Sequence, residues 1–395
     1  MLTERSRILA GLFVAALALR AQVTGISPLF ADVRSDLGIS HAVVGLLVTI
    51  PVLCMGVFAP PARDVASWFG LRMALGGCLL LIAAAGVARA AIPGAVTLIV
   101  LTIPIGIAMG IAGPLLAVLV KKYLPDRPAF ATGVYVTGLQ ISAAGAAAVA
   151  IPLASALSGW RSALAVFSVL TFVLLGALVV FTRGVADNGE ARPERLRMPL
   201  RSGVAWVLVC IFGLQSLVYY GLVAWLPDLY VERGWSEHRA ALLLALISII
   251  GIPAGIVVPW FADRAGSRRA YLVSAATVMI VALLGLELLP GGAWVWVALV
   301  GAAGGILFAI CLTLPLDVAD LPGGVGSVAG MMLLGGYVIA ALGPLGLGAA
   351  RDLTGSFQAS IAVLVVAAGG VIAAALTLTP KRLARGVERL PILPG

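Results

Sequence analysis

The sequence predicts an all-α integral membrane protein whose chain crosses the bilayer 12 times, in two halves of six helices. Of its 395 residues, 62% are apolar and 11% are charged, against about 45–50% and about 25% in soluble domains. A transmembrane helix takes about 20 apolar residues, so a dozen would use about 240 of them and leave short loops. Runs such as 242–260 are almost continuously apolar, unlike the alternating strands of an outer-membrane barrel. A soluble globular fold and a barrel are therefore excluded.

The breaks between apolar runs define the predicted helices. In chain order they span residues 8–31, 41–62, 73–92, 96–120, 129–153, 161–182, 204–230, 238–261, 270–289, 293–317, 326–350 and 357–379. The first run resembles a signal peptide because Arg5 and Arg7 precede it, but it continues past Arg20 to Phe30. It is therefore kept as the first helix.

Basic residues predict the orientation. With a cytoplasmic N-terminus, the inside segments hold 19 Lys and Arg residues, and the outside segments hold six. The outside residues are Arg34, Arg89, Arg161, Arg233, Arg239 and Arg351. This asymmetry predicts that both termini are cytoplasmic. The predicted domains are an N-terminal half at 1–182, a cytoplasmic linker at 183–203, a C-terminal half at 204–380 and a cytoplasmic tail at 381–395.

The two halves show an internal repeat with an offset of 196 residues. Gly38-Ile39-Ser40 matches Gly234-Trp235-Ser236, and Gly70-Leu71-Arg72 matches Gly266-Ser267-Arg268. Gly159 matches Gly355 at the same offset. The matches fall in equivalent loops, which indicates two parallel repeats of the kind found in transporters.

Two loops carry motifs that resemble a known superfamily. The first holds Arg63, Asp64, Gly70 and Arg72, and the second holds Asp263, Arg264, Gly266 and Arg268. They look like the signature loop of the major facilitator superfamily and its echo in the second half. The resemblance implies the major facilitator fold and a role for both cytoplasmic loops in gating.

A narrower resemblance covers most of the N-terminal half. Leu19-Arg20, Ser27-Pro28-Leu29, the segment 36–40 and the segment 120–125 together look like the cyanate and 2-nitroimidazole transporter family, CynX/NimT. The resemblance implies transport of a cyanate-like anion or a nitroimidazole. The family usually has Asn and Pro beside the Leu-Arg pair, where this chain has Ala18 and Ala21.

Arg20 is the candidate substrate anchor. It lies about 18 Å into the first predicted helix, near the middle of a hydrocarbon core about 30 Å thick. An Arg at this depth costs about 2.5–3.5 kcal/mol on insertion scales, so it should face a wet cavity and an anionic or dipolar solute. Thr24 and Ser27 follow at i+4 and i+7 and share its face. The alternative is a structural Arg20 that binds backbone carbonyls or acids near helix ends.

Further polar residues are candidates to line the same cavity. They are Tyr135 and Gln140 on the fifth helix, Gln215 and Tyr219 on the seventh, and Tyr337 on the eleventh. An offset of 199 places Tyr219 opposite Arg20, with Gln215 one turn before it. Bonding between helices is the alternative role for these side chains. Gln22 is expected to face away from the cavity and to pack against another helix.

The sequence lacks the residues that other classes of function would need. His41 and His238 lie at loop ends and the four cysteines are scattered in apolar runs, so we expect no metal, no cofactor and no enzymatic activity. The basic residues behind the net charge of +9 lie between apolar runs and indicate how the chain is oriented in the membrane. We therefore expect no nucleic acid partner. The expected partners are a small-molecule substrate, the bilayer of the inner membrane, and protons or a counter-solute, with the chain as a monomer. A drug exporter with a structural Arg20 is the main alternative, and a channel is less favoured.

Overall fold

The structure is a computed structural model that describes residues 4–124, 126–157, 159–184, 198–265, 268–318 and 322–378. Within these ranges, 11 helical segments are long and apolar enough to cross a membrane, and His41–Val57 is a shorter apolar helix. The all-helical prediction is confirmed. The described residues separate into two compact units, the first made of 4–184 with 223–249 and the second of 198–222 with 250–378.

The helices follow the chain without strands between them in the described part. The elements up to residue 182 are α1 (Glu4–Thr24), η1 (Ser27–Leu29), α2 (Phe30–Leu37), α3 (His41–Val57), α4 (Ala62–Phe69), α5 (Leu71–Ala91), α6 (Ala95–Val100), α7 (Thr102–Tyr123), α8 (Pro128–Ala156) and α9 (Trp160–Thr182). The remaining elements are α10 (Gly203–Glu232), α11 (Glu237–Ala265), α12 (Arg268–Leu288), η2 (Pro290–Gly292), α13 (Ala293–Val318), α14 (Pro322–Thr354) and α15 (Gln358–Leu376). Helices α10 and α11 each contribute one part to each unit.

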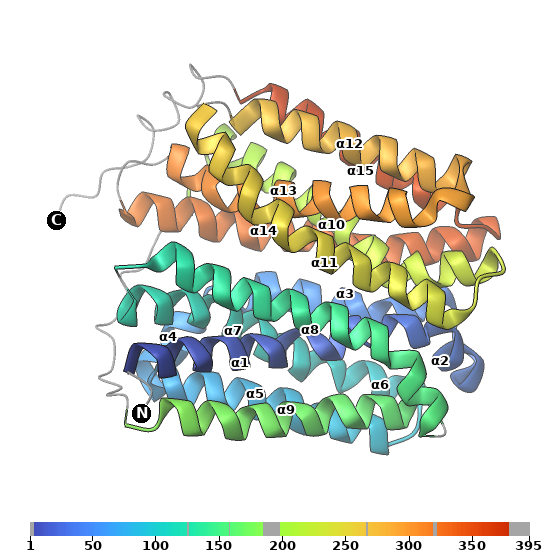
Figure 1. The fold of residues 1–395 in the computed structure, drawn as a ribbon, viewed down its shortest axis with the longest axis horizontal. Helices are drawn as coiled ribbons and strands as arrows, with labels where there is room; N and C mark the ends of the chain where they lie inside the picture. Colours follow the sequence, from blue (N-terminus) through green and yellow to red (C-terminus); the bar gives the residue numbers. More distant parts are fainter. Residues whose placement is uncertain are drawn as a thin grey trace. The chain divides into compact units, whose positions relative to one another are not determined.

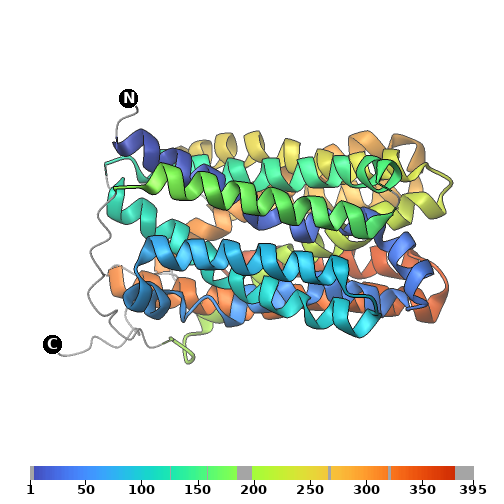
Figure 2. The same cartoon turned by 90° about the horizontal axis from the view of Figure 1, so that it is seen from below.

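In the first unit, α1 packs against α8 and α9, while α5 packs against α7 and α9 (Figures 1 and 2). Helices α3 and α7 also pack against each other. This last contact uses Gly106 and Gly110, which are four residues apart on α7, because a Cβ on Gly110 would collide with the carbonyl oxygen of Cys54. The spacing therefore serves close helix packing.

In the second unit, α12 packs against α13 and α15, and α14 packs against α15. Gly251 and Gly305 allow α11 and α13 to approach closely, since a Cβ on Gly305 would collide with the carbonyl oxygen of Gly251. Here too, glycines serve close helix packing.

The first predicted helix is interrupted. Helix α1 ends at Thr24, a 3-10 turn covers Ser27–Leu29, and α2 begins at Phe30. Pro28 explains the break, because proline lacks the N–H that would donate to the carbonyl of Thr24 in a continuous helix. Similarly, the predicted 41–62 helix ends at Val57 before Pro60 and Pro61, and α4 follows.

Both members of two glycine pairs that define the internal repeat have positive φ. Gly38 and Gly234 have φ of 62° and 84°, and Gly159 and Gly355 have φ of 136° and 75°. Residues with a Cβ rarely adopt positive φ, so each position favours glycine for the same reason. The repeat therefore places glycines with positive φ at corresponding positions between helices.

Candidate substrate site

Arg20 lies in the last two turns of α1 and is 9% exposed. Thr24 ends the same helix, and Ser27 begins the 3-10 turn that follows. The predicted stripe, which consists of Arg20, Thr24 and Ser27, therefore runs across the helix break. Both are fully covered in this structure, with 2% and 0% exposure. The predicted stripe thus lies inside the first unit and is not open to its surface.

The two hydroxyl groups of the stripe donate back to their own chain. Thr24 Oγ1 donates to the carbonyl oxygen of Arg20 at 2.9 Å, and Ser27 Oγ donates to that of Val23 at 3.4 Å. Such bonds to the carbonyl four residues earlier often bend helices. They use the one proton of each hydroxyl group, so each oxygen can take part in a further hydrogen bond only as an acceptor.

A second buried arginine lies on the other side of α1. Arg89, on the last turn of α5, is 1% exposed and donates through Nη2 to the carbonyl oxygen and Oε1 of Gln22 at 2.8 and 2.7 Å. The sequence counted Arg89 among the outside basic residues at the end of the predicted 73–92 helix, and α5 continues to Ala91 in agreement with that helix. Gln22 packs against neighbouring helices as expected, donating to Ser168 Oγ at 2.9 Å.

Sequence reasoning missed Arg89 because it lies close to the predicted end of an apolar run. Its immediate neighbours Ala88, Ala90 and Ala91 are small and apolar. An arginine between alanines, four residues before Pro93, fits the last turn of a helix better than a polar loop. That local composition was the signal in the sequence that could have indicated a helical Arg89.

Helix α8 carries two of the candidate residues next to α1. Tyr135 is half-buried, and Gln140 Nε2 donates to the carbonyl oxygen of Ser248 at 3.5 Å. Helix α8 approaches α1 closely, since Ser142 Oγ donates to the carbonyl oxygen of Leu17 at 2.6 Å. The structure thus brings the α1 and α8 candidates onto adjacent elements of one unit.

The remaining candidates lie in the second unit. Gln215 is buried and donates to Ser216 Oγ at 2.7 Å. The ring centroids of Tyr219 and Tyr220 are 5.1 Å apart, and those of Tyr220 and Tyr337 are 6.4 Å apart. The ring of Tyr220 therefore lies near the rings of both tyrosine candidates.

Only part of each signature loop is described. Gly70 has φ of 79° and joins α4 to α5, and Asp64 is exposed in the first turn of α4. Arg72 is half-buried at the start of α5. In the second loop, Arg268 Nη1 donates to the carbonyl oxygen of Thr313 at 2.8 Å. The side chains of Arg63, Asp263 and Arg264, and the whole of Gly266, lie outside the described residues.

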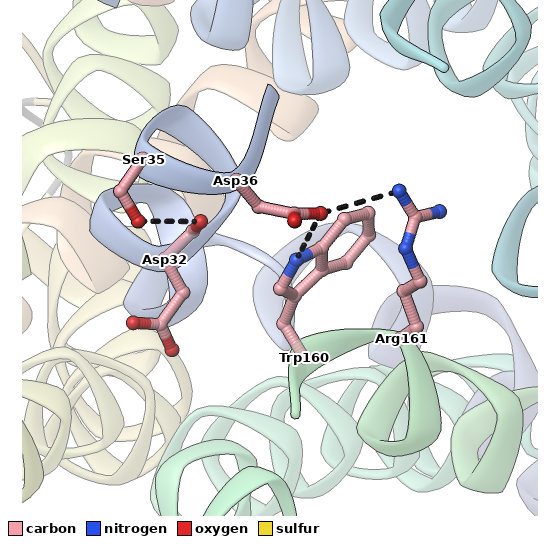
Figure 3. A network of polar contacts seen from close by, with 5 residues as sticks. All are labelled: Asp32, Ser35, Asp36, Trp160 and Arg161. Atoms are coloured by element: carbon pink, nitrogen blue, oxygen red, sulfur yellow. Dashed lines mark hydrogen bonds and ion pairs between the residues drawn. The ribbon is translucent and has the colours of Figure 1, made fainter. Parts of the chain in front are cut away.

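Helix α2 is held to α9 by a polar cluster (Figure 3). The Asp36 carboxylate accepts hydrogen bonds from Trp160 Nε1 and Arg161 Nη2, both at 3.3 Å. The Arg161 guanidinium also lies over the Trp160 ring, 4.2 Å from its centroid. The segment after the helix break is therefore anchored independently of α1.

A helical fold with a broken first helix and a buried arginine can be compared with known families. The family model described as Major Facilitator Superfamily matches residues 12–344. The chain belongs to this superfamily. It is therefore a multi-pass transporter of the inner membrane, as the resemblance implied.

Individual relatives of this superfamily member are transporters. A 2-nitroimidazole transporter of Escherichia coli (strain K12) is 31% identical, over 90% of this chain and 91% of that protein. The cyanate transport protein CynX of the same organism is 28% identical, over 94% and 97%. The crystal structure of a bacterial homolog of the human lysosomal transporter Spinster matches with a TM-score of 0.75 at 17% identity, over 98% and 99% of the two chains. The last match concerns the fold alone.

Proposed function

We propose that this protein is a secondary active transporter of a small anionic or strongly dipolar solute, such as a cyanate-like anion or 2-nitroimidazole. In this proposal Arg20 is the central substrate anchor and the two halves of the chain alternate access to it. The observation that carries the proposal is the burial of Arg20 in the last turns of a membrane-spanning helix.

The energetic argument concerns where a cation can be tolerated. Arginine in a transmembrane segment is costly, and such residues commonly mark substrate or ion pathways. A cation in a membrane-spanning segment favours a solute that brings negative charge or a large dipole. The names of two relatives, a 2-nitroimidazole transporter and a cyanate transport protein, agree with this class of solute.

The two buried arginines of the first unit face different sides of α1. Arg20 and Gln22 are two positions apart, which corresponds to a rotation of about 200° around a helix. Arg89 is bound to Gln22, so its place is on the far side from Arg20. This supports a binding role for Arg20 and a different role for Arg89.

The other candidates would complete the site as hydrogen-bonding groups. We assign this role to Thr24, Ser27, Tyr135, Gln140, Gln215, Tyr219 and Tyr337. The loops with Arg63, Asp64, Gly70 and Arg72, and with Asp263, Arg264, Gly266 and Arg268, would act in gating. Both termini are assigned to the cytoplasm, and the working form is a monomer.

Inward movement of an anion requires an energy source. An inside-negative potential opposes each negative charge by about 2.3 kcal/mol per 100 mV. Uptake would therefore be coupled to proton symport or to exchange with a counter-solute.

The test is ligand-induced thermal stabilisation of the purified protein and of an Arg20→Ala variant. The probes are cyanate, thiocyanate, nitrate, small carboxylates, 2-nitroimidazole and bulky cationic drugs. A ligand that binds only the folded state stabilises it by RT ln(1 + [L]/Kd), about 2.7 kcal/mol at 100 times Kd. Arg161→Ala is the matched control, because it removes an arginine that pairs with Asp36 and is not assigned to the substrate site.

The expected result is stabilisation of the wild type and of Arg161→Ala by a small anion or by 2-nitroimidazole, with none in Arg20→Ala. Stabilisation by bulky cations alone, unchanged in Arg20→Ala, would reject the proposal. That second result would favour an exporter of xenobiotics in which Arg20 is structural.

A further inference from the structure

We propose that Arg89 is a positioning residue for the substrate anchor: its guanidinium clamps the C-terminal end of α1 and so sets the direction of Arg20. The inference rests on the proposed function, because it gives Arg20 the role of anchor. Arg89 itself is assigned no contact with the solute.

The clamp connects four helices of the first unit. Arg89 of α5 holds the carbonyl oxygen and the side chain of Gln22 on α1, and its Nη1 lies 3.4 Å from Thr102 Oγ1 on α7. Gln22 continues the chain of bonds to Ser168 on α9. Thr102 Oγ1 donates to the carbonyl oxygen of Leu98 on α6, and Ser168 Oγ donates to that of Leu164 on its own helix, so both hydroxyl oxygens are left to accept.

The helix break explains why the clamp acts at Gln22. The last four carbonyls of a helix lack partners within it, and α1 ends only two residues after Gln22. These carbonyls carry the negative end of the helix dipole, which a cation stabilises. Arg89 therefore satisfies an acceptor that the break exposes.

The surroundings are shaped to admit Gln22. Gly86 lies one turn before Arg89 on α5, and a Cβ there would be 2.8 Å from Gln22 Nε2 and would collide with Ser168 Oγ. The glycine thus keeps open the space that the Gln22 side chain fills.

All three acceptors of Arg89 are neutral, and its Nε has no partner among the described residues. Burying a charge with incomplete compensation costs free energy, and apolar side chains of similar volume often stabilise as well or better. Simple packing is therefore a poor account of this arginine. Its specific effect is on the direction of the Arg20 side chain, because it fixes the rotation of α1 at Gln22, two residues after Arg20.

The test compares transport of 2-nitroimidazole and of cyanate by wild type, Arg89→Met, Arg89→Lys and Thr102→Val in vesicles. Methionine keeps much of the volume and removes every donor. We expect Arg89→Met to raise KM about tenfold, equivalent to about 1.4 kcal/mol, with Vmax changed less than twofold. Lysine retains the cation and should restore most of the affinity. Thr102→Val removes only the longest contact and should stay within twofold of wild type.

Hydrogen–deuterium exchange supplies a readout that is independent of transport. The peptide that covers residues 16–27 should exchange faster in Arg89→Met than in wild type, because the end of α1 loses its clamp. Thr102→Val should leave its exchange unchanged. If Arg89→Met does not fold, Gln22→Met removes the side-chain contacts and retains the backbone carbonyl, and it should raise KM by a smaller factor.

Each pattern of results decides between the two proposals. Faster exchange with an unchanged KM would overturn the positioning role and leave Arg89 as a structural residue, and so would no change in either. Unchanged affinity in Arg20→Ala would reject Arg20 as anchor. In that case, a raised KM with faster exchange in Arg89→Met would still show that Arg89 positions α1.

Discussion

The guanidinium of Arg34 on α2 lies 3.5 Å from the carboxylate of Asp228 on α10. Both residues belong to the first unit, and their side chains are 28% and 6% exposed. The pair connects the segment after the break in the first helix to the final part of α10. Because Asp228 is the more buried partner, the two residues should contribute unequally to stability.

Removal of Arg34 should destabilise the protein more than neutralisation of Asp228. Arg34→Ala leaves a buried carboxylate without its cation, at a cost of about 1–3 kcal/mol. Asp228→Asn keeps the volume and removes the charge that needs compensation. Thermal unfolding should show the larger decrease for Arg34→Ala, and the double variant should recover part of it. Equal and additive decreases would contradict a coupled pair.

The carboxylates of the N-terminal half should not carry protons during transport. Residues 1–182 contain five acids, which are Glu4, Asp32, Asp36, Asp64 and Asp126. Four of these side chains are exposed and Asp32 is half-buried. Each change to the matching amide should therefore leave the shape of the pH profile of transport unchanged. A profile abolished by any one of these substitutions would disprove the prediction.

The contact between α3 and α7 should tolerate no side chain at Gly110. Its Cβ would meet the Cys54 backbone, whereas a Cβ on Gly113 of the same helix meets nothing within 4 Å. Gly110→Ala should cost about 1–3 kcal/mol through overpacking. Gly113→Ala should be neutral or stabilise by about 0.5–1 kcal/mol, because glycine disfavours a helix. Chemical or thermal unfolding of both variants measures the difference, and similar stabilities would refute the close approach.

The Asp36 cluster should anchor α2 through Trp160 (Figure 3). Trp160→Phe removes the indole donor to Asp36 and weakens the stacking of Arg161. We expect a loss of about 1 kcal/mol, seen as a lower melting temperature. In an Asp36→Asn background the same change should cost less. An equal cost in both backgrounds would show that the indole bond to Asp36 contributes nothing.

The proposed orientation predicts which exposed positions a membrane-impermeant reagent can label. Ser35 and Asp126 are both exposed and are assigned to opposite sides of the membrane. In a cysteine-free background, Ser35→Cys should react with an impermeant maleimide in intact cells. Asp126→Cys should react only after permeabilisation. The reverse pattern would invert the topology.

The fold class follows from properties that are local in the sequence. Apolar runs of membrane length and the absence of alternating strands determine helices, because the bilayer core requires every backbone group to bond within its own segment. The glycine pairs at an offset of 196 residues, such as Gly38 and Gly234, could also be found from the sequence, because a positive φ favours glycine at a single position whatever its neighbours are. The same holds for Arg20, whose depth follows from counting along one helix.

What only the tertiary structure decided is which side chains meet. The sequence shows Pro28, but it does not show that the carbonyl oxygen of Gln22 before the break in the helix accepts a hydrogen bond from a neighbouring helix. The partners of Arg89 were not predicted because its acceptors lie on other helices, 67 positions away for Gln22. Arg34 and Asp228 are 194 positions apart. The sequence by itself determines the helices and the candidate anchor, whereas partners between distant segments depend on how those helices pack, which no local pattern encodes.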